Sequence, residues 1–287
     1  MTTKNYFTFA ILLSFGALLS TGCKKQVHYN IQAASNNSLA ILTYSDVFEQ
    51  INAAVSSEMQ LDELTNGSWN MNGSLCADVT LTPTGAGFPK TLTIDYGTGC
   101  VGPDGVLRSG MIVAQFSGNY RTEGTAIEVW FDAYTTGQYA VSGTDSLNNQ
   151  GDDGSGNPVF SETLRNVVIS WGTQEILWQA DLTRTWIGGY NTNYTTPDTT
   201  STMMMAVLHD DVFELTGTAS GNDSNTHPYS LETTSPLMLQ TGCDYIQSGT
   251  LTISPANYNV GTVDYGTGTC EKQATLEVDG EVFNFTM

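Results

Sequence analysis

Hydrophobic and polar residues alternate along most of the chain after Asn66, and glycine-rich turns separate the alternating runs. One run divides its residues between two faces: Ile127, Val129, Phe131 and Ala133 on one, and Glu128, Trp130, Asp132 and Tyr134 on the other. A period of two residues is typical of a half-buried antiparallel strand. The pattern predicts an all-β fold built as one large antiparallel meander sheet, curved or partly closed. Two β-domains divided near residue 155 are the alternative.

The last alternating run predicts a hairpin in residue detail. Asp279-Gly280 is typical of a two-residue primed turn, which fixes the pairing of the strands on either side. In that register apolar residues meet apolar residues across the strands: Leu276 with Phe283, and Ala274 with Phe285, with Val278 opposite Glu281.

The N-terminal part has a different period. Val47, Phe48 and Ile51 recur at helical spacing after Asp46, which predicts one amphipathic helix within residues 41–65. Residues 23–40 have little apolar content and are interpreted as a tether, and residues 66–287 as the β-domain. Two stretches rich in Asn, Asp, Thr, Gly or Pro, residues 147–158 and 190–202, are expected to be long surface loops.

A short motif, Asp-Tyr-Gly-Thr-Gly, occurs twice, at Asp95 and at Asp264, and each copy is followed by a cysteine. Each copy is also preceded by a cysteine at a similar distance, so the repeat pairs Cys76 with Cys100 and Cys243 with Cys270. Each such disulfide should stabilise the fold by about 3 to 4 kcal/mol. The repeated aspartates are interpreted as turn residues that bond to their own backbone.

The first residues indicate secretion. Lys4 precedes a short apolar run over residues 7–19, and Gly22-Cys23 follows. This layout resembles the lipobox of bacterial lipoproteins, in which the cysteine is acylated after cleavage of residues 1–22. An ordinary cleaved signal with an incidental Cys23 is the alternative. By resemblance to the sorting rule of Gram-negative lipoproteins, Lys24 and Lys25 favour the outer membrane.

Charge narrows the range of partners. The chain carries a formal charge of −20, and loss of residues 1–22 removes one lysine and no acid, which gives −21. Such a surface repels phosphate backbones, so nucleic-acid binding is not expected.

Several motifs together resemble a family of envelope lipoproteins of the Bacteroidota to which no activity is assigned. They lie along most of the mature chain: Gly22-Cys23-Lys24-Lys25, Phe88-Pro89, Asp95-Tyr96-Gly97, Pro103-Asp104-Gly105, Arg108-Ser109-Gly110, Thr183-Arg184-Thr185-Trp186, Leu215-Thr216-Gly217 and Asp264-Tyr265-Gly266. The resemblance implies an envelope lipoprotein and no particular reaction.

Candidate chemistry is sparse. Asp145, Asp152, Asp153 and Asn157 supply hard oxygen ligands on a glycine-rich stretch, and such ligands suit calcium. A loop that is simply exposed to solvent is the alternative. A zinc site from the four paired cysteines lacks CxxC spacing and is not expected.

Two other sites are hypotheses of a different kind. Trp130 and Tyr134 fall on the polar face of their strand, where exposed rings can stack on sugars. His209 beside Asp210 and Asp211 is the cluster that a hydrolase could use, although no nucleophile elbow accompanies it.

The sequence therefore favours a non-enzymatic, lipid-anchored envelope protein without a required cofactor. Its expected partners are the membrane, through Cys23, and a glycan or another envelope protein. A glycan- or ligand-binding module and a hydrolase are the alternatives.

Overall fold

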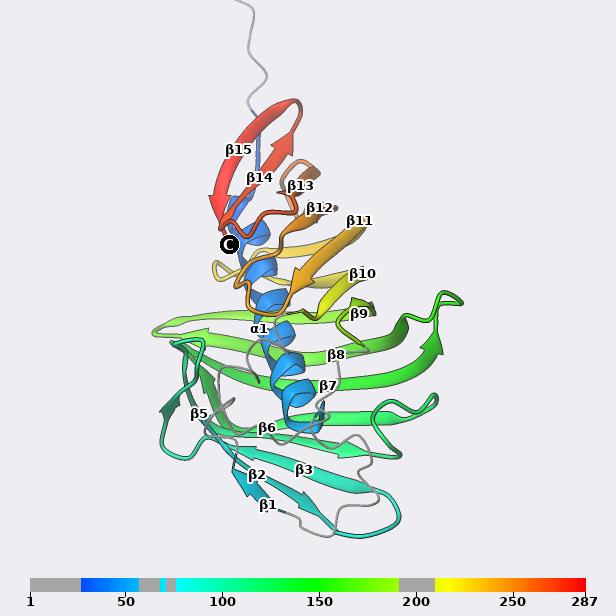
Figure 1. Ribbon diagram of the computed structural model, residues 1–287. Helices are drawn as coiled ribbons and strands as arrows, with labels where there is room; N and C mark the ends of the chain where they lie inside the picture. Colours follow the sequence, from blue (N-terminus) through cyan, green and yellow to red (C-terminus); the bar gives the residue numbers. More distant parts are fainter. Residues whose placement is uncertain (1–26, 57–67, 71–75, 191–209) are drawn as a thin grey trace, which may run out of the picture.

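The structure is a computed structural model, and it describes residues 27–56, 68–70, 76–190 and 210–287. One α-helix and fifteen strands form this part of the chain (Figure 1). In chain order they are α1 (Ile31–Ser56), β1 (Ser68–Asn70), β2 (Asp78–Thr82), β3 (Lys90–Asp95), β4 (Cys100–Val101), β5 (Leu107–Phe116), β6 (Ala126–Thr136), β7 (Tyr139–Asp152), β8 (Pro158–Trp171), β9 (Gln174–Gly188), β10 (Val212–Asn222), β11 (Pro228–Gln240), β12 (Ser248–Pro255), β13 (Gly261–Thr267), β14 (Gln273–Val278) and β15 (Glu281–Thr286).

The strands form one antiparallel sheet in which sequence neighbours are almost always spatial neighbours. The order runs from β1 to β15, and only β4 leaves this path, because it pairs with β5 at the side. Among the described strands, β1 and β15 have one sheet neighbour each, so the sheet is open. The predicted all-β meander is thereby confirmed. β7 and β8, which lie on either side of residue 155, pair directly with each other, so the sheet is not divided there.

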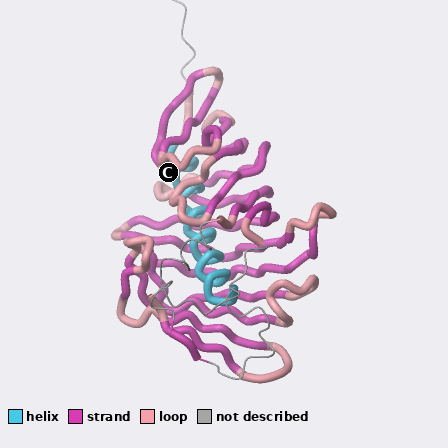
Figure 2. The backbone as a smooth tube through the Cα atoms, in the orientation of Figure 1, coloured by secondary structure: helices cyan, strands magenta, loops and turns pink. Residues whose placement is uncertain are grey.

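Helix α1 lies along the inner face of the sheet and crosses the strands (Figures 1 and 2). A helix of 26 residues is about 39 Å long, which matches the width of about eight strands. Its side chains therefore reach elements as far apart as β15 and β5. Ser35 donates to the carbonyl of Thr286, and Asp46 is bonded by Arg108.

The helix begins ten residues before the segment predicted for it. Asn30 caps its first turn, since its Oδ1 accepts a hydrogen bond from the amide of Ala33 at 3.0 Å. Residues 31–40 are therefore helical and not a tether, and residues 57–65 of the predicted segment lie outside the described residues. The prediction failed because Asn36, Asn37 and Ser38, although polar, are buried against the sheet.

The last hairpin has the predicted register. Val278 pairs with Glu281, Leu276 with Phe283 and Ala274 with Phe285. The apolar side chains of β14 and β15 thus join the single core that α1 and the inner face of the sheet share.

Residues 147–158, by contrast, are not a long loop. β7 continues to Asp152 and β8 begins at Pro158, so only a tight turn joins them. Asn148, Asn149 and Gly151 occur inside β7, where Asn149 is buried and donates to the carbonyl of Tyr120.

Both predicted disulfides are present. Cys76 is bonded to Cys100 and Cys243 to Cys270. Each bridge closes the open end of a hairpin, β2–β3 in the first case and β12–β13 in the second.

Candidate functional site

The inner face carries an ion pair where α1 passes the first disulfide. Arg108 on β5 is buried and its guanidinium contacts Asp46 of the helix at 2.5 Å and Asp104 at 2.6 Å. Gln50 and Thr136 also donate to the carboxylate of Asp46. These bonds tie the middle of α1 to β5 and β6.

A second charged group lies deeper, on strands β7, β8 and β9. Arg184 and Glu162 form an ion pair at 3.0 Å with almost no exposed surface. The guanidinium of Arg184 also lies over the ring of Phe48, 4.5 Å from its centroid. Asp145 is fully buried, and neither of its oxygens has a hydrogen-bond partner among the residues that the structure describes. Burial and the nearby Glu162 raise the pKa of Asp145 well above its usual range.

Asp211, one of the carboxylates of the hydrolase hypothesis, is bound to the end of the helix. Its two oxygens accept hydrogen bonds from Asn52 at 2.9 Å and from the indole of Trp186 at 3.1 Å. Burial raises its pKa to about 7. His209 lies outside the described residues, and Asp211 is only 4% exposed, so its carboxylate serves to hold α1 against β9.

A groove of about 320 Å³ runs beside α1, between the segment around Asp104 and the segment around Cys243. Glu49 and Asp46 line it from the helix, and Asp104 and Asp244 line it from the loops. Burial, and then the nearby Asp46, raise the pKa of Glu49 to about 8. The described residues that line the groove include these carboxylates and the hydroxyls of Thr43 and Ser45, but no histidine.

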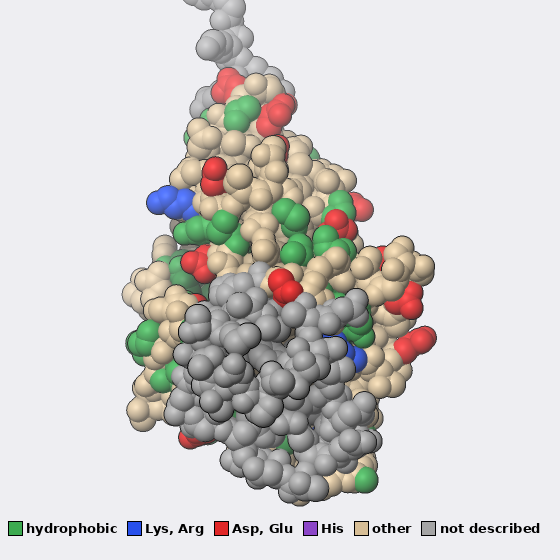
Figure 3. Space-filling model, in the orientation of Figure 1, with side chains coloured by type: hydrophobic (Ala, Val, Ile, Leu, Met, Phe, Trp, Pro, Cys, Tyr) green, Lys and Arg blue, Asp and Glu red, His purple; other side chains and the backbone are tan. Residues whose placement is uncertain are grey.

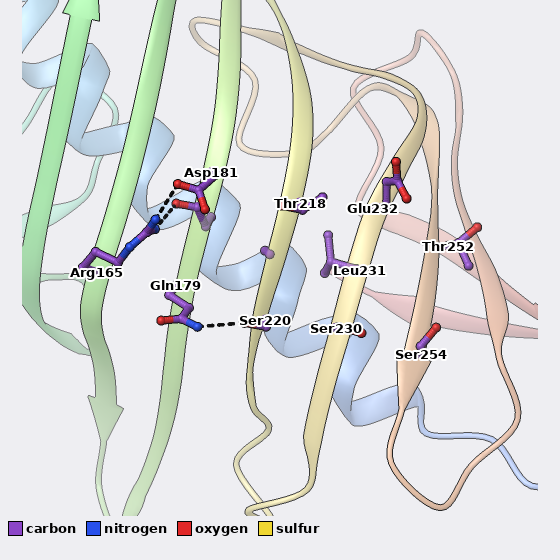
Figure 4. A pocket seen from close by; sticks show the side chains of 12 residues that line it. Arg165, Gln179, Asp181, Thr218, Ser220, Ser230, Leu231, Glu232, Thr252 and Ser254 are labelled. Carbon is purple, nitrogen blue, oxygen red and sulfur yellow. Dashed lines mark hydrogen bonds and ion pairs between the residues drawn. The ribbon is translucent and has the colours of Figure 1, made fainter.

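The outer face of the sheet offers a different kind of site. A trough of about 590 Å³ extends across five consecutive strands, β8 to β12 (Figure 4). Its side chains point outward from two rows of paired residues: Asp181, Thr218, Glu232 and Thr252 in one, and Gln179, Ser220, Ser230 and Ser254 in the other. We call this set, with Arg165, the outer trough.

The sequence explains the shape of the outer trough. Short Ser and Thr side chains stand on β10 and β12, whereas the longer Arg165 and Gln179 stand at one side on β8 and β9, and Glu232 stands on β11 between the short side chains. Register shifts on either side of the rows, between Leu164 and Val167 and between Leu215 and Thr218, are bulges that bend the strands. A hollow on the outer face follows from both features.

Three hydrogen bonds hold side chains of the outer trough in place. Arg165 donates to Asp181 at 2.5 Å and to the carbonyl of Ala180 at 2.8 Å, and Gln179 donates to Ser220 at 3.1 Å (Figure 4). Hydroxyls, an amide, a guanidinium and carboxylates therefore face solvent, and Arg165, Gln179, Asp181 and Ser220 among them are bonded in pairs. Such groups can donate to and accept from a polar ligand.

A second hollow of about 510 Å³ adjoins the outer trough and shares Gln179 and Ser220 with it. It is more apolar, since Val168, Leu177 and Pro228 line it and Leu177 is 42% exposed. A polar edge next to an apolar surface suits a ligand that has both hydroxyl groups and a hydrocarbon face.

The predicted pair of sugar-binding aromatic residues is separated by the sheet. Trp130 is 39% exposed on the outer face, but Tyr134 is buried and packs against Tyr96 and Phe131. The cause is a bulge at Ala133, whose φ of 48° breaks the alternation, so the next residue turns inward. Trp130 does not line either hollow.

The predicted calcium ligands are not brought together. Asp145 is buried in the middle of β7, and Asp152 lies seven residues along the same strand, about 23 Å away. Asp153 accepts hydrogen bonds from Ser155 and Asn157 within the turn itself. Among the described residues no three Asp, Glu, His or Cys side chains are placed to hold one metal ion.

Sequence reasoning overlooked the buried charges, although the alternation contains a signal for them. Arg184 stands at an inward position of β9, between buried Leu182 and Trp186, and Glu162 stands inward on β8 between Phe160 and Leu164. A charged residue at an inward position of a regular strand indicates a buried ion pair.

The chain was compared with known proteins. No protein-family model matches it, and no curated protein or solved structure is significantly similar to it. Within the described residues, no helix combines the length and the apolar character that crossing a membrane requires.

Proposed function

We propose that the protein is a lipid-anchored, non-catalytic protein of the cell envelope that binds a polar ligand, a neutral carbohydrate chain, in the outer trough. The observation that carries the proposal is the array of outward hydroxyl, amide and charged side chains across β8 to β12, in which Arg165 bonds to Asp181 and Gln179 to Ser220. The anchor is Cys23, acylated after removal of residues 1–22, and the Lys24-Lys25 pair directs the protein to the outer membrane.

A neutral ligand is favoured by charge. The outer trough contains one arginine and two carboxylates, Asp181 and Glu232, on a chain with a formal charge of −20. An anionic ligand would be repelled by this field. Sugar hydroxyls pair well with Ser, Thr, Gln and carboxylate side chains, and the adjoining surface at Leu177 and Pro228 suits the hydrocarbon face of a sugar ring.

A non-catalytic role is favoured by how the inner carboxylates are used. Asp46, Glu162 and Asp211 all bond to arginine, asparagine or tryptophan side chains that fasten α1 or its neighbouring strands. Their bonds account for a structural role, and the hydrolase hypothesis on His209 has no support from them.

A glycan array probed with the purified mature protein tests the proposal. Glu232→Gln and Gln179→Ala should bind the glycans that the wild-type protein binds with a Kd about tenfold higher for each hydrogen bond to the ligand that is lost. Glu277→Gln, on the outer face of β14 beyond the outer trough, is the matched control and should bind normally.

Three outcomes contradict the proposal. Binding unaffected by both trough variants removes the outer trough as the site. Recovery of a bound glycan as shorter fragments shows an enzyme. Absence of an acyl group on Cys23, tested by mass spectrometry of the protein from cells that acylate lipoproteins, removes the anchor.

A further inference from the structure

The start of the described chain is fastened to one end of the sheet. The carbonyl of His28 accepts a hydrogen bond from the amide of Asn259 at 2.8 Å. The ring of Tyr29 stacks on that of Phe283 of β15, with the ring centroids 3.7 Å apart. Asn30 donates to Asp223 at 2.8 Å. The point where the chain enters the fold is therefore fixed beside β13, β14 and β15 (Figure 1).

Very little chain separates this point from the proposed lipid anchor. Residues 24–26 alone lie between Cys23 and Val27, where the described chain begins. Four residue steps span at most about 14 Å when fully extended. A tether of this length cannot let the fold turn freely above a bilayer, because the domain is several times larger than the tether.

We infer that the end of the sheet formed by Tyr29, Val260 and the β14–β15 hairpin faces the lipid surface, and we call it the anchor end. The inference rests on the proposed acylation of Cys23. The lipid anchor and the short chain after it determine which surface of the protein meets the membrane.

The side chains of the anchor end suit shallow contact with lipid headgroups. Val260 and Val282 are 58% and 59% exposed, and Tyr29 is 38% exposed. Val282 shares a row with Glu277 and Thr262 on the outer face, and Val260 precedes that row by two residues. Asn259 also donates to Asp279 in the hairpin turn, so these residues lie close together.

Charge selects the kind of lipid surface. Glu277, Asp279 and Glu281 are exposed around the same hairpin, and Figure 3 shows acidic side chains beside apolar ones at this narrow end. A strongly anionic surface would repel these carboxylates. The anchor end therefore fits a zwitterionic lipid surface, on which valine and tyrosine side chains touch the headgroup layer.

This orientation has a consequence for the outer trough. The strands follow one another from β15 at the anchor end to β1 at the far end (Figure 1). The outer trough then begins on β12, where Thr252 pairs with Thr262 of β13, and extends away from the lipid to β8. It opens sideways, where a ligand in the surrounding medium can reach it.

Fluorescence quenching on vesicles tests the inference. The acylated mature protein, which begins at Cys23, is reconstituted into phosphatidylcholine vesicles that contain a headgroup quencher, with an environment-sensitive label at Val260→Cys or Val282→Cys. Labels at these two positions should lose fluorescence. The matched control is Leu107→Cys on β5, which is 50% exposed and remote from the anchor end, and its label should keep its fluorescence.

A variant with a longer tether provides a second test in the same experiment. Insertion of ten Gly and Ser residues between Lys25 and Gln26 should restore fluorescence at Val260→Cys while the protein stays bound to vesicles. Melting curves of the labelled variants establish that each is folded.

The outcomes separate the two proposals. If Cys23 is acylated and the labels at 107, 260 and 282 are quenched equally, the orientation is wrong and the anchor stands. If quenching at position 260 persists with the longer tether, the short tether does not set the orientation. If it also persists in anionic vesicles, the carboxylates of the anchor end do not select a zwitterionic surface. If no acyl group is found on Cys23, the anchor and the orientation fail together.

Discussion

The two Asp-Tyr-Gly units share a sequence, but their tyrosines meet different parts of α1. Tyr96 donates to Gln50 at 2.8 Å, and Gln50 in turn donates to Asp46, the carboxylate bound by Arg108. Tyr265 instead bonds to Ser38 at 2.9 Å, a hydroxyl that also donates to a carbonyl of its own helix. The first unit therefore joins a charged network, whereas the second makes a neutral contact.

What the units have in common is local. In each, the aspartate accepts a hydrogen bond from the glycine amide two residues later, at 2.7 Å for Asp95 and 2.8 Å for Asp264. In each, a disulfide closes the hairpin. The motif thus builds a turn that directs a tyrosine toward α1. The residue of α1 that the tyrosine meets then determines how much the contact contributes to the free energy of unfolding.

The largest expected effect comes from the disulfides. Each closes a loop of similar length, 24 and 27 residues apart in sequence, so replacing both cysteines of either bridge by alanine should cost about 3 to 4 kcal/mol. Thermal melting with and without a reductant measures the effect, and reduction should lower Tm by several degrees. An unchanged Tm on reduction would mean that neither bridge supports the fold.

Arg108→Met should break the charged network of the first unit. Asp46 and Asp104 would lose their cation, and because they are partly exposed we expect a loss of about 3 kcal/mol in the free energy of unfolding. Arg165→Met is the matched control, since its pair with Asp181 is exposed and is worth less than about 1 kcal/mol. Equal losses in urea unfolding would show that the network of the first unit has no special weight.

Glu49 of α1 should make the stability depend on pH, because it lies beside Asp46 in the charged network that the first unit joins. Burial raises its pKa from 4.5 to about 8, so between these values the folded state holds a proton that the unfolded state has lost. The contribution of Glu49 to the free energy of unfolding is then fully present below pH 4.5 and is lost as the pH rises toward 8. The expected loss is about 2 kcal/mol, because this group is partly exposed.

Urea unfolding at pH 5 and pH 8.5 checks this sign. In Glu49→Gln the decline should be smaller, and what remains belongs to Asp145 and Asp211, whose pKa values burial also raises. A wild-type protein that is more stable at pH 8.5 than at pH 5 would contradict the assignment.

Removing the tyrosine hydroxyls compares the two contacts directly. Tyr96→Phe leaves the buried Gln50 without its donor and should cost about 2 kcal/mol. Tyr265→Phe should cost about 1 kcal/mol, because Ser38 keeps its bond to Ala34. The comparison is wrong if the second variant loses more stability than the first.

The smallest effect is expected at the aspartates. Asp95→Asn and Asp264→Asn keep an oxygen that can accept the glycine amide bond, so each should lose at most about 1 kcal/mol. Retention of glycan binding in both variants is expected, since neither residue lines the outer trough. Loss of binding at normal stability would point to a ligand at the turns.

Much of the sheet could be predicted because its cues are local. The register of β14 and β15 follows from Asp279-Gly280, and the disulfide pairs follow from the repeat. The inward turn of Tyr134 could not be predicted, because the bulge at Ala133 depends on the close approach of Gly110 on β5, where a Cβ would lie 2.3 Å from the Ala133 carbonyl oxygen.

The sequence by itself determined most of the strands and turns, the disulfides, and the inward and outward alternation up to the bulge at Ala133, since each depends on neighbouring residues or on a short repeat. Only the tertiary structure decided that α1 begins at Ile31, that Arg184 pairs with Glu162, and that five strands form the outer trough. The physical reason is that the pattern predicts polar side chains such as Asn36 and Asn37 to be exposed to solvent. Their hydrogen-bond partners, Ser224 and Trp178, lie more than a hundred residues away in the chain, so only the folded structure shows that they are buried.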